Sequence, residues 1–364
     1  MIQARIRKHY AVGPESSAFD LDVEFEAADG VTVLFGASGA GKTLTLDCIA
    51  GFARPDSGRI LLDDRILYDA DAGVSLRPQH RDCGYVFQNY ALFPHMTLRG
   101  NLEFAAERLP RLERHRRVND MLDRFRVSEF AGRYPHEVSG GQKQRCSIAR
   151  ALIVHPRLLL LDEPARGLDA PLRDDLYDVL RELREEFRVP ILLVTHDLDA
   201  AFAVGDEMLV YEGGRIAQRG KAAEVLRCPA SEDVARLLGY STFLKAEVLR
   251  LNPAADSSVL RLLDREFAGP YFPGSLIGDR LTLCVRPEEL RLQSEAGENR
   301  VPGDVTSVEE RPAGVRLRMD AAGVAVTVDV PGAQWQSARE SKEQYVEFPS
   351  SALRALRNAA PLKQ

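Results

Sequence analysis

The octapeptide GASGAGKT, residues 36–43, restricts what this chain can fold into more than any other feature, and it lies between the apolar run VTVLF and a helix-like stretch. Glycine is costly in backbone entropy, so three glycines here indicate a special backbone path or a close ligand. The spacing fits G-x-x-x-x-G-K-[ST], in which backbone N–H groups and the lysine hold phosphates and the hydroxyl ligates magnesium. The sequence therefore predicts a phosphate-binding loop at the N-terminus of a helix. The predicted loop residues are Gly36, Ala37, Ser38, Gly39, Ala40, Gly41, Lys42 and Thr43.

Strand-like apolar runs alternate with helical patterns through the first two thirds of the chain. RLLLLDEP and PILLVTH suit strands buried on both faces, and the stretch 171–188 between them carries leucines at helical spacing. Strand, helix, strand in this order predicts a parallel α/β sheet, whose ligands bind beyond the carboxyl ends of the strands. Because Lys42, Asp162, Glu163 and His196 fall at such ends, we expect one site to gather them.

The pattern changes near Cys228 and Pro229, and from about Phe243 onward short alternating segments dominate, separated by Gly and Pro turns. In GVRLRMD and GVAVTVDV, apolar residues occupy every second position, which is typical of half-exposed strands. The sequence therefore predicts an α/β domain over residues 1–235 and a small all-β domain over residues 236–364.

Bulk composition removes several classes of protein. The chain has 364 residues and a net charge of −6, so its overall charge gives no indication of a nucleic-acid partner. The five cysteines form no C-x-x-C pair, which argues against a disulfide framework or a zinc site and fits a reducing compartment. The first ten residues lack the apolar core of a secretory signal, and no apolar run reaches ~18 residues. A role at a membrane would therefore require a membrane-spanning partner.

Two further segments carry side chains that suit nucleotide chemistry. In LLLLDEP, Asp162 suits a carboxylate that holds magnesium through water, and Glu163 suits a base for an attacking water. In VSGGQKQRCSIARALI, residues 139–141 (Ser-Gly-Gly) precede a helix and offer backbone N–H groups to a second anion. The alternatives are two exposed acids that end a strand and a serine that only caps a helix.

These segments occur in the order seen in subunits of the ATP-binding-cassette family, which the chain resembles over residues 1–235. The motifs that carry the resemblance are GASGAGKT, Gln88 in YVFQNYALFPH, VSGGQKQR, LLLLDEP, Asp169 and His196 in LLVTHD. It implies an α/β P-loop NTPase cassette with a helical subdomain, followed by a small all-β C-terminal domain of the OB-like, oxyanion-binding type. It also implies a homodimer in which each ATP lies between the phosphate loop of one chain and residues 139–141 of the other.

The resemblance also implies the cofactors and the roles of individual residues. ATP and Mg²⁺ would bind, the metal beside Thr43, Gln88 and Asp162. Glu163 would polarise the attacking water, His196 would hold the γ-phosphate, and Gln88 would sense the metal and the water. The remaining implied nucleotide contacts, besides the loop, are Tyr10, Ser139, Gly140, Gly141, Gln142 and Asp169. Tyr10 lies where the family keeps an aromatic residue that stacks on adenine, and simple packing is the alternative for it.

One segment departs from the family pattern. Small residues usually precede the Leu-Asp that ends this loop, but here PARGLDA places Arg166 and Gly167 there. The resemblance puts these positions at the dimer seam. Arg166 would pair across the seam, reach phosphate, or lie in solvent as a surface arginine.

Within the family, the stretch from residue 58 to residue 102 looks closer to ATPases of molybdate importers than to sugar or peptide cassettes. In the tail, NRVPGDVTSV resembles the start of the oxyanion-binding domain of those subunits, although AGENR replaces its Ser-Ala-Arg lead-in. VRPEEL is shared by a broader group of importers, so it discriminates less.

The function that the resemblance implies is ATP hydrolysis in a membrane importer, with molybdate or tungstate as the first candidate cargo. The chain would lie peripherally on the cytoplasmic face of the inner cell membrane. Its partners would be a second copy of itself, transmembrane permease subunits that meet ALFPHMTLRGNL, and a periplasmic or extracellular binding protein, with no nucleic acid. The alternatives are an importer for sulfate, iron, polyamine or sugar, a soluble cassette ATPase without a transporter, and a tail that only senses oxyanions.

Overall fold

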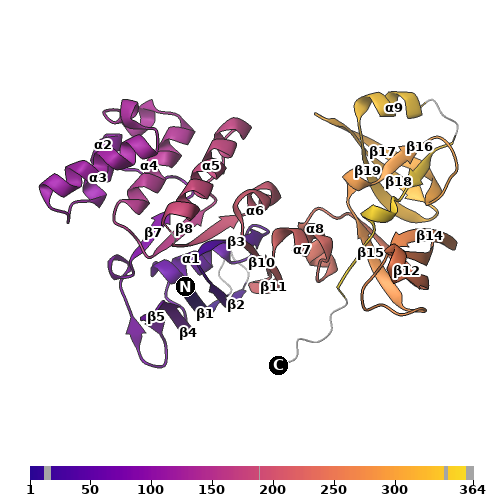
Figure 1. The fold of residues 1–364 in the computed structure, drawn as a ribbon, viewed down its shortest axis with the longest axis horizontal. Helices are drawn as coiled ribbons and strands as arrows, with labels where there is room; N and C mark the ends of the chain where they lie inside the picture. Colours follow the sequence, from indigo (N-terminus) through magenta and orange to yellow (C-terminus); the bar gives the residue numbers. More distant parts are fainter. Residues whose placement is uncertain (12–17, 188, 340–342, 358–364) are drawn as a thin grey trace. The chain divides into compact units, whose positions relative to one another are not determined.

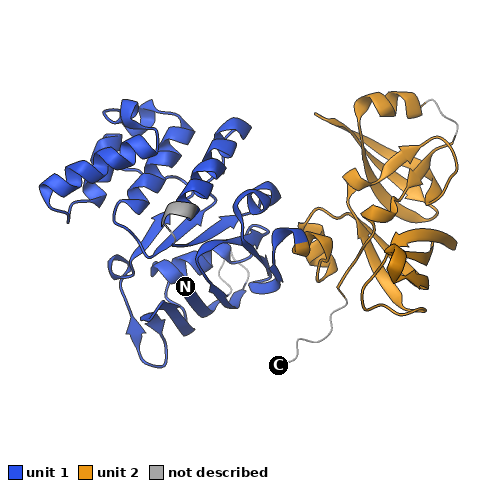
Figure 2. Cartoon of the chain, in the orientation of Figure 1, with its two compact units in different colours: residues 1–223 blue, residues 224–364 orange. Residues whose placement is uncertain are grey.

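The computed structural model of the chain describes residues 1–11, 18–187, 189–339 and 343–357. Two compact units make up the chain, residues 1–223 and residues 224–364 (Figure 2). The division between the units falls within helix α7 (Ala222–Arg227), upstream of the predicted domain boundary, and the short helix α8 (Glu232–Leu237) belongs to the second unit.

A six-stranded sheet of order β11-β10-β3-β9-β8-β7 forms the centre of the first unit (Figure 1). Its strands are β3 (Gly30–Gly36), β7 (Cys83–Val86), β8 (Leu158–Asp162), β9 (Pro190–Thr195), β10 (Glu207–Glu212) and β11 (Arg215–Gly220). Strands β10, β3, β9, β8 and β7 pair in parallel, and β11 pairs antiparallel to β10. Every residue of β8 and β9 is buried, as expected for parallel strands covered on both faces. The predicted parallel α/β sheet is confirmed.

A second, antiparallel sheet of order β2-β1-β4-β5-β6 completes the core of this unit. Its strands are β1 (Ile2–Tyr10), β2 (Phe19–Ala27), β4 (Ser57–Leu62), β5 (Arg65–Asp69) and β6 (Val74–Ser75). Along β1, buried apolar residues alternate with exposed polar residues, so one face packs on the core. Helix α1 (Lys42–Ala50) contacts strands of both sheets, and its buried Leu46 and Ile49 join them into one core.

In the described part of the first unit, helices α2 to α6 follow α1 along the chain. Helices α2 (Leu98–Ala105), α3 (Arg111–Arg124) and α4 (Gly140–Leu152) contact one another and form the helical subdomain (Figure 1). Helix α5 (Ala170–Phe187) connects β8 to β9, and α6 (Leu198–Val204) contacts β3 and β9. Among the described residues, no helix combines the length and the apolar character that crossing a membrane requires.

The second unit contains two antiparallel sheets that share one buried core. One sheet consists of β12 (Thr242–Asn252), β13 (Ser257–Leu262), β14 (Arg265–Pro270), β15 (Arg280–Val285) and β21 (Arg354–Ala355). The other consists of β16 (Arg291–Gln293), β17 (Arg300–Arg311), β18 (Gly314–Ala321), β19 (Val324–Val330) and β20 (Tyr345–Glu347), and helix α9 (Gly332–Ala338) contacts β18. Val326, Val328 and Val330 are buried, which confirms the period-two prediction for this tail.

Arg81 holds the C-terminal end of α1 in place. Its side chain is 1% exposed, and its guanidinium donates from Nη1 to the carbonyls of Cys48 and Ile49 and from Nε to that of Leu76, each at 2.8 Å. The last carbonyls of a helix lack intrahelical partners and carry the negative end of its dipole, so a cation stabilises them. A Cβ on the adjacent Gly51, which has φ +88°, would lie 2.7 Å from Arg81 Nε. The buried arginine therefore requires glycine at that position.

Replacing Arg81 should destabilise the helix that follows the phosphate loop. We expect Arg81→Met to lower the free energy of unfolding by about 2–4 kcal/mol, because three carbonyls lose their donor in a buried place. Denaturant unfolding followed by circular dichroism measures this. Arg77→Met is the control, since Arg77 is exposed in the same segment, and its effect should stay below about 0.5 kcal/mol. Equal losses in the two variants would contradict the role of Arg81.

Candidate nucleotide-binding site

The glycine-rich loop leaves the carboxyl end of β3 and enters α1 at Lys42. Gly39 and Gly41 have φ values of +80° and +100°, which disfavour residues with a side chain. A Cβ on Gly41 would also lie 2.7 Å from Leu21 Cδ1, so packing as well as conformation requires glycine there. The tip of the loop, residues 37–39, is exposed and open to a ligand.

Lys42 places a buried positive charge inside this loop. Its side chain is 5% exposed, and Nζ donates to the carbonyls of Gly36 (2.8 Å) and Ala37 (2.7 Å). Burial lowers the pKa of Lys42, and the negative charges of Glu163 and Asp162 oppose that effect. The buried Lys42 ammonium has lost most of its hydration, so a phosphate that enters the loop would be attracted to it.

Thr43 and Asp162 form a second pair at the same edge of the sheet. Thr43 Oγ1 donates to Asp162 Oδ1 at 3.0 Å, which connects the start of α1 to the end of β8. Asp162 is 5% exposed, and burial raises the pKa of its carboxyl, while the hydrogen bond from Thr43 opposes the rise. A hydroxyl and a carboxylate thus meet in contact with the phosphate loop.

Glu163 occupies an unusual backbone conformation. Its φ is +44°, in the left-handed region that residues other than glycine rarely adopt, and its N–H donates to the Val194 carbonyl at 3.0 Å. Such conformations cost free energy and cluster at functional sites. The Glu163 side chain is 13% exposed, and its Oε1 accepts from His196 Nδ1 at 3.0 Å. Parallel pairing of β8 with β9 brings these two distant residues together.

Gln88 and Arg166 complete the surroundings of the Glu163 carboxylate. Arg166 Nη1 lies 3.2 Å from Glu163 Oε2. With its amide oxygen turned toward the guanidinium, Gln88 accepts from Arg166 Nε at 3.0 Å and from Nη1. In the opposite orientation the Gln88 nitrogen lies 3.5 Å from Glu163 Oε2. The first orientation satisfies the arginine donors, so the hydrogen-bond network assigns it.

The predicted second anion site forms the N-terminus of α4. Ser139 is the N-cap: its Oγ accepts from the Gln142 N–H (3.3 Å), and Gln142 Oε1 accepts from the Ser139 N–H (2.9 Å). This capping box uses the Gln142 side chain inside the helix start. Among the hydrogen bonds and ion pairs of the described residues, none joins residues 139–141 to the loop 36–43.

Asp169 and Tyr10 also lie apart from the Glu163 cluster. Asp169 Oδ1 accepts from the Leu172 N–H at 3.2 Å in the first turn of α5. Tyr10 ends β1 with a 44% exposed ring, and Lys8 Nζ lies 5.3 Å from the ring centroid. An exposed ring with a cation beside it is free to stack on a planar ligand.

Sequence reasoning missed two residues of α4 that hold the segment after Gln88. Ser147 Oγ donates to the Tyr90 carbonyl at 2.9 Å, and Arg150 Nη1 donates to the Ala91 carbonyl at 2.8 Å. Tyr90 and Ala91 have φ values of +63° and +48°, so these bonds stabilise a strained turn. The sequence gives one indication of their shared role: Ser147 and Arg150 are three residues apart, and residues at that spacing lie on one face of a helix.

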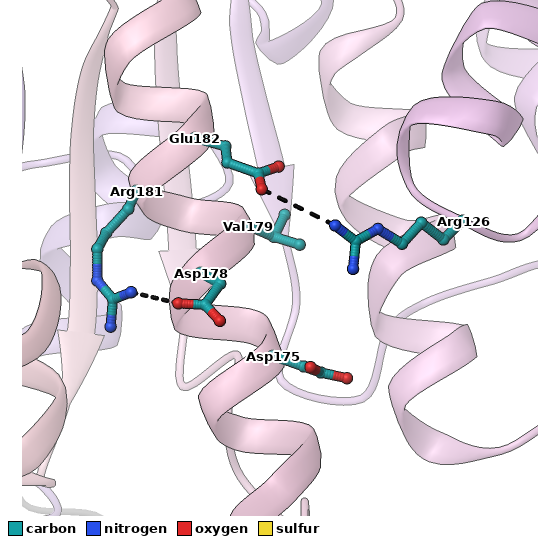
Figure 3. A pocket seen from close by; sticks show the side chains of 6 residues that line it. All are labelled: Arg126, Asp175, Asp178, Val179, Arg181 and Glu182. Atoms are coloured by element: carbon teal, nitrogen blue, oxygen red, sulfur yellow. Dashed lines mark hydrogen bonds and ion pairs between the residues drawn. The ribbon is translucent and has the colours of Figure 1, made fainter.

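A surface pocket along α5 has no such chemistry (Figure 3). Arg126, Val179 and Arg181 line it with the three carboxylates of Asp175, Asp178 and Glu182. Each carboxylate has an arginine partner: Arg181 pairs with Asp178, Arg126 lies 4.0 Å from Glu182, and Arg145 lies 2.6 Å from Asp175. These ion pairs neutralise the pocket, and we assign it no ligand.

The geometry defines a class of protein. A phosphate loop at a helix N-terminus, with an Asp-Glu pair and a histidine at the ends of two neighbouring parallel strands, is the arrangement of a P-loop nucleotide-binding protein. A family model described as ABC transporter matches residues 20–166. The molybdenum import ATP-binding protein ModC of Rhodospirillum rubrum is 36% identical over 87% of this chain and 81% of its own. The chain belongs to the ABC transporter family.

Two other similar proteins are also named as import ATP-binding proteins. The spermidine/putrescine import ATP-binding protein PotA of Nitrosospira multiformis is 37% identical over 79% of this chain and 78% of its own. The molybdate/tungstate import ATP-binding protein WtpC of Pyrococcus horikoshii is 31% identical over 91% of this chain and 94% of its own.

Solved structures similar to the chain include the following two. A dimeric ATP-binding cassette in a post-hydrolysis state with ADP and Pi aligns with a TM-score of 0.53 and 27% identity, over 61% of this chain and 99% of that one. CbiO1 of Clostridium perfringens, part of the transporter complex CbiONQ, aligns with a TM-score of 0.52 and 28% identity, over 65% and 92% of the two chains. Together with the all-β second unit, they confirm the predicted fold class.

Proposed function

We propose that the chain is the ATP-hydrolysing subunit of a membrane importer. ATP hydrolysis coupled to transport is the activity of its family, and the relatives named above are import proteins. The observation that carries the proposal is the cluster around Glu163. His196 lies 3.0 Å from its carboxylate, and Asp162, its neighbour in the chain, accepts a hydrogen bond from Thr43. In this proposal residues 1–235 hydrolyse ATP and residues 236–364 form a regulatory domain.

The phosphate and metal contacts follow from the charges of the site. The loop 36–43 would surround the phosphates, with the buried Lys42 ammonium toward the outer ones. Thr43, Asp162 and Gln88 supply a hydroxyl, a carboxylate and an amide, which are the oxygen donors that Mg²⁺ prefers. Among the described residues, no group of three or more His, Cys, Asp or Glu is placed to hold a metal ion. In this proposal the ion would share its shell with phosphate and water. When bound, the ion supplies positive charge that offsets the phosphate oxygens.

The chemical step is assigned to Glu163. Its carboxylate would accept a proton from the attacking water, and His196 would hold the γ-phosphate beside it. The strained backbone and the bond to His196 fix the direction of the carboxylate. Tyr10 would stack on the adenine ring, since it is exposed at the end of β1.

Glu163→Gln should keep ATP binding and lose hydrolysis by about 10²-fold or more, the scale of general-base catalysis. The amide keeps the size of the side chain and removes its capacity to accept a proton. Phosphate release and equilibrium binding of a fluorescent ATP analogue measure the two effects separately. Glu182→Gln on α5 is the control, since Glu182 faces the surface pocket, and it should hydrolyse ATP at the wild-type rate. A Glu163→Gln variant with wild-type turnover would overturn the assignment.

The active unit is proposed to be a homodimer with two shared sites. Residues 139–141 form the N-terminus of α4, and none of the hydrogen bonds or ion pairs among the described residues joins them to the loop 36–43. We infer that the phosphate they hold lies in a second copy. A related cassette was solved as a dimer with ADP and Pi bound. In this proposal Ser139, Gly140, Gly141 and Gln142 of one copy meet the nucleotide in the other, and Asp169 lies at the seam between them.

Mixed dimers distinguish shared sites from separate ones. With Lys42→Ala in one chain and Ser139→Arg in the other, both changes fall on the same composite site, so the opposite site stays whole. With both changes in one chain, each composite site carries one defect. We expect ATP-analogue binding to about half of the sites in the first arrangement and a marked loss at both in the second. Equal occupancy in the two arrangements would contradict sharing.

The partners of an importer subunit follow from its place in transport. We propose that residues 91–102, after Gln88, meet transmembrane permease subunits, and that a periplasmic or extracellular binding protein delivers cargo to that permease. Phe93, from this segment, packs edge-on against the half-exposed Phe104 with ring centroids 4.8 Å apart, which leaves an aromatic surface for a partner. The chain would then lie peripherally on the cytoplasmic face of the inner membrane.

Molybdate or tungstate is our first candidate for the cargo. The relatives named for these anions align along the tail as well as the cassette, and WtpC covers 91% of this chain. Relatives named for spermidine/putrescine import are equally similar, so a polyamine is the second candidate. An ATPase does not touch the cargo during transport, and only the tail could sense it.

The tail contains features that bear on oxyanion sensing. Asn299, the first residue of NRVPGDVTSV, is 9% exposed. Its Oδ1 accepts from the Ala268 N–H at 2.8 Å, and its Nδ2 donates to the carbonyls of Ala268 (2.8 Å) and Phe348 (2.9 Å). The cavity beside β17 and β18 is lined by carboxylates, Asp304, Asp320 and Glu343. Negative charge repels a dianion, so an oxyanion would need another part of the tail.

Calorimetry decides whether the tail senses an oxyanion. Lys42→Ala should remove anion binding at the phosphate loop of the full chain, so that any remaining signal comes from the tail. If the tail is the sensor, we expect this variant to show heat of binding with molybdate and none with sulfate. Absence of heat with molybdate, tungstate and sulfate alike would leave the tail with a bracing role. Heat with spermidine in place of the anions would favour the polyamine relatives.

A further inference from the structure

Arg166 departs from the family pattern and touches the residue to which we assign hydrolysis. Its guanidinium lies 3.2 Å from Glu163 Oε2 and, through Nε and Nη1, donates to the Gln88 amide oxygen. His196 occupies the other carboxylate oxygen at 3.0 Å. Both oxygens of Glu163 therefore have a side-chain partner within the chain.

The loop that carries Arg166 favours this contact. The Arg166 N–H donates to the Glu163 carbonyl at 3.1 Å, and Gly167 follows with φ +75°. This tight turn places the two side chains three residues apart on the same side. A small residue, which the family usually has here, could not reach Gln88 and Glu163 together.

The contact has a chemical consequence. The guanidinium beside Glu163 Oε2 takes up an acceptor position on the carboxylate that an attacking water would need. The same guanidinium occupies the Gln88 oxygen, to which we assign contact with the metal and the water. Arg166 thus binds two groups that hydrolysis needs.

We propose that Arg166 is a positioning residue that restrains hydrolysis by bridging Gln88 and Glu163. This inference rests on the proposed role of Glu163 as the base. Arg166 is 59% exposed, so solvent weakens the pair and the restraint is modest and reversible. The uncoupled ATPase activity of the chain is held low by a residue that acts through Glu163, and no phosphate contact by Arg166 is involved.

Steady-state ATP hydrolysis by the full chain without permease tests the proposal. We expect Arg166→Ser to raise kcat about threefold to fivefold, the scale of one exposed ion pair, with KM for ATP within about twofold. Arg166→Lys keeps the charge and should return kcat toward the wild-type value. Arg181→Ser is the matched control, because Arg181 forms an ion pair of the same spacing with Asp178 on α5, and its kcat should not change.

The remaining outcomes each decide the matter. A kcat that stays the same or falls in Arg166→Ser overturns the restraint, and a KM that rises with unchanged kcat assigns Arg166 to phosphate instead. In the Glu163→Gln background Arg166→Ser should add nothing, and an equal increase there would show that Arg166 does not act through Glu163. Glu163→Gln alone tests the proposed base, so the failure of that role is recognised separately from the failure of the restraint.

Discussion

The parallel pairing of β3, β9, β8 and β7 is the constraint on which the rest of the site depends. Parallel strands end at one edge of a sheet, so segments far apart in the chain deliver their next residues to the same place. Lys42 follows β3, Glu163 follows β8, and His196 follows β9. Without that pairing the Glu163 carboxylate and the His196 ring, which lie 3.0 Å apart, would have no reason to meet.

Charge inside the site is balanced by short-range partners in the chain itself. Lys42 uses the carbonyls of its own loop, Asp162 uses the Thr43 hydroxyl, and Glu163 uses His196 and Arg166. Buried or half-buried charges without partners would cost several kcal/mol, so such pairs are expected before a ligand arrives. A nucleotide and its metal ion would have to replace these partners. In our proposal for Arg166, its pair with Glu163 restrains hydrolysis in this way.

In the proposed importer, the second unit could affect transport only by sensing the cargo. Its core is built from alternating apolar residues of two antiparallel sheets, and Asn299 ties three segments of that core together. A residue used in this way is explained by stability. The core thus accounts for Asn299 in NRVPGDVTSV, and Asp304 and Asp320 place negative charge in the cavity beside β17 and β18.

Local patterns in the sequence determined the elements. Buried strands β8 and β9 follow from runs of apolar residues, α5 from leucines at helical spacing, β18 and β19 from alternation, and the phosphate loop from its glycines and Lys42. These features depend on neighbours in the chain, so the sequence alone sufficed. Only the tertiary structure decided the left-handed backbone of Glu163 and the burial of Arg81 against α1. The same holds for the hydrogen bond from Arg150 to the segment after Gln88, and for the bridge from Arg166 to Gln88 and Glu163. Most of these contacts join residues distant in sequence, and their geometry follows from how the sheet and the helical subdomain pack, which no local pattern encodes.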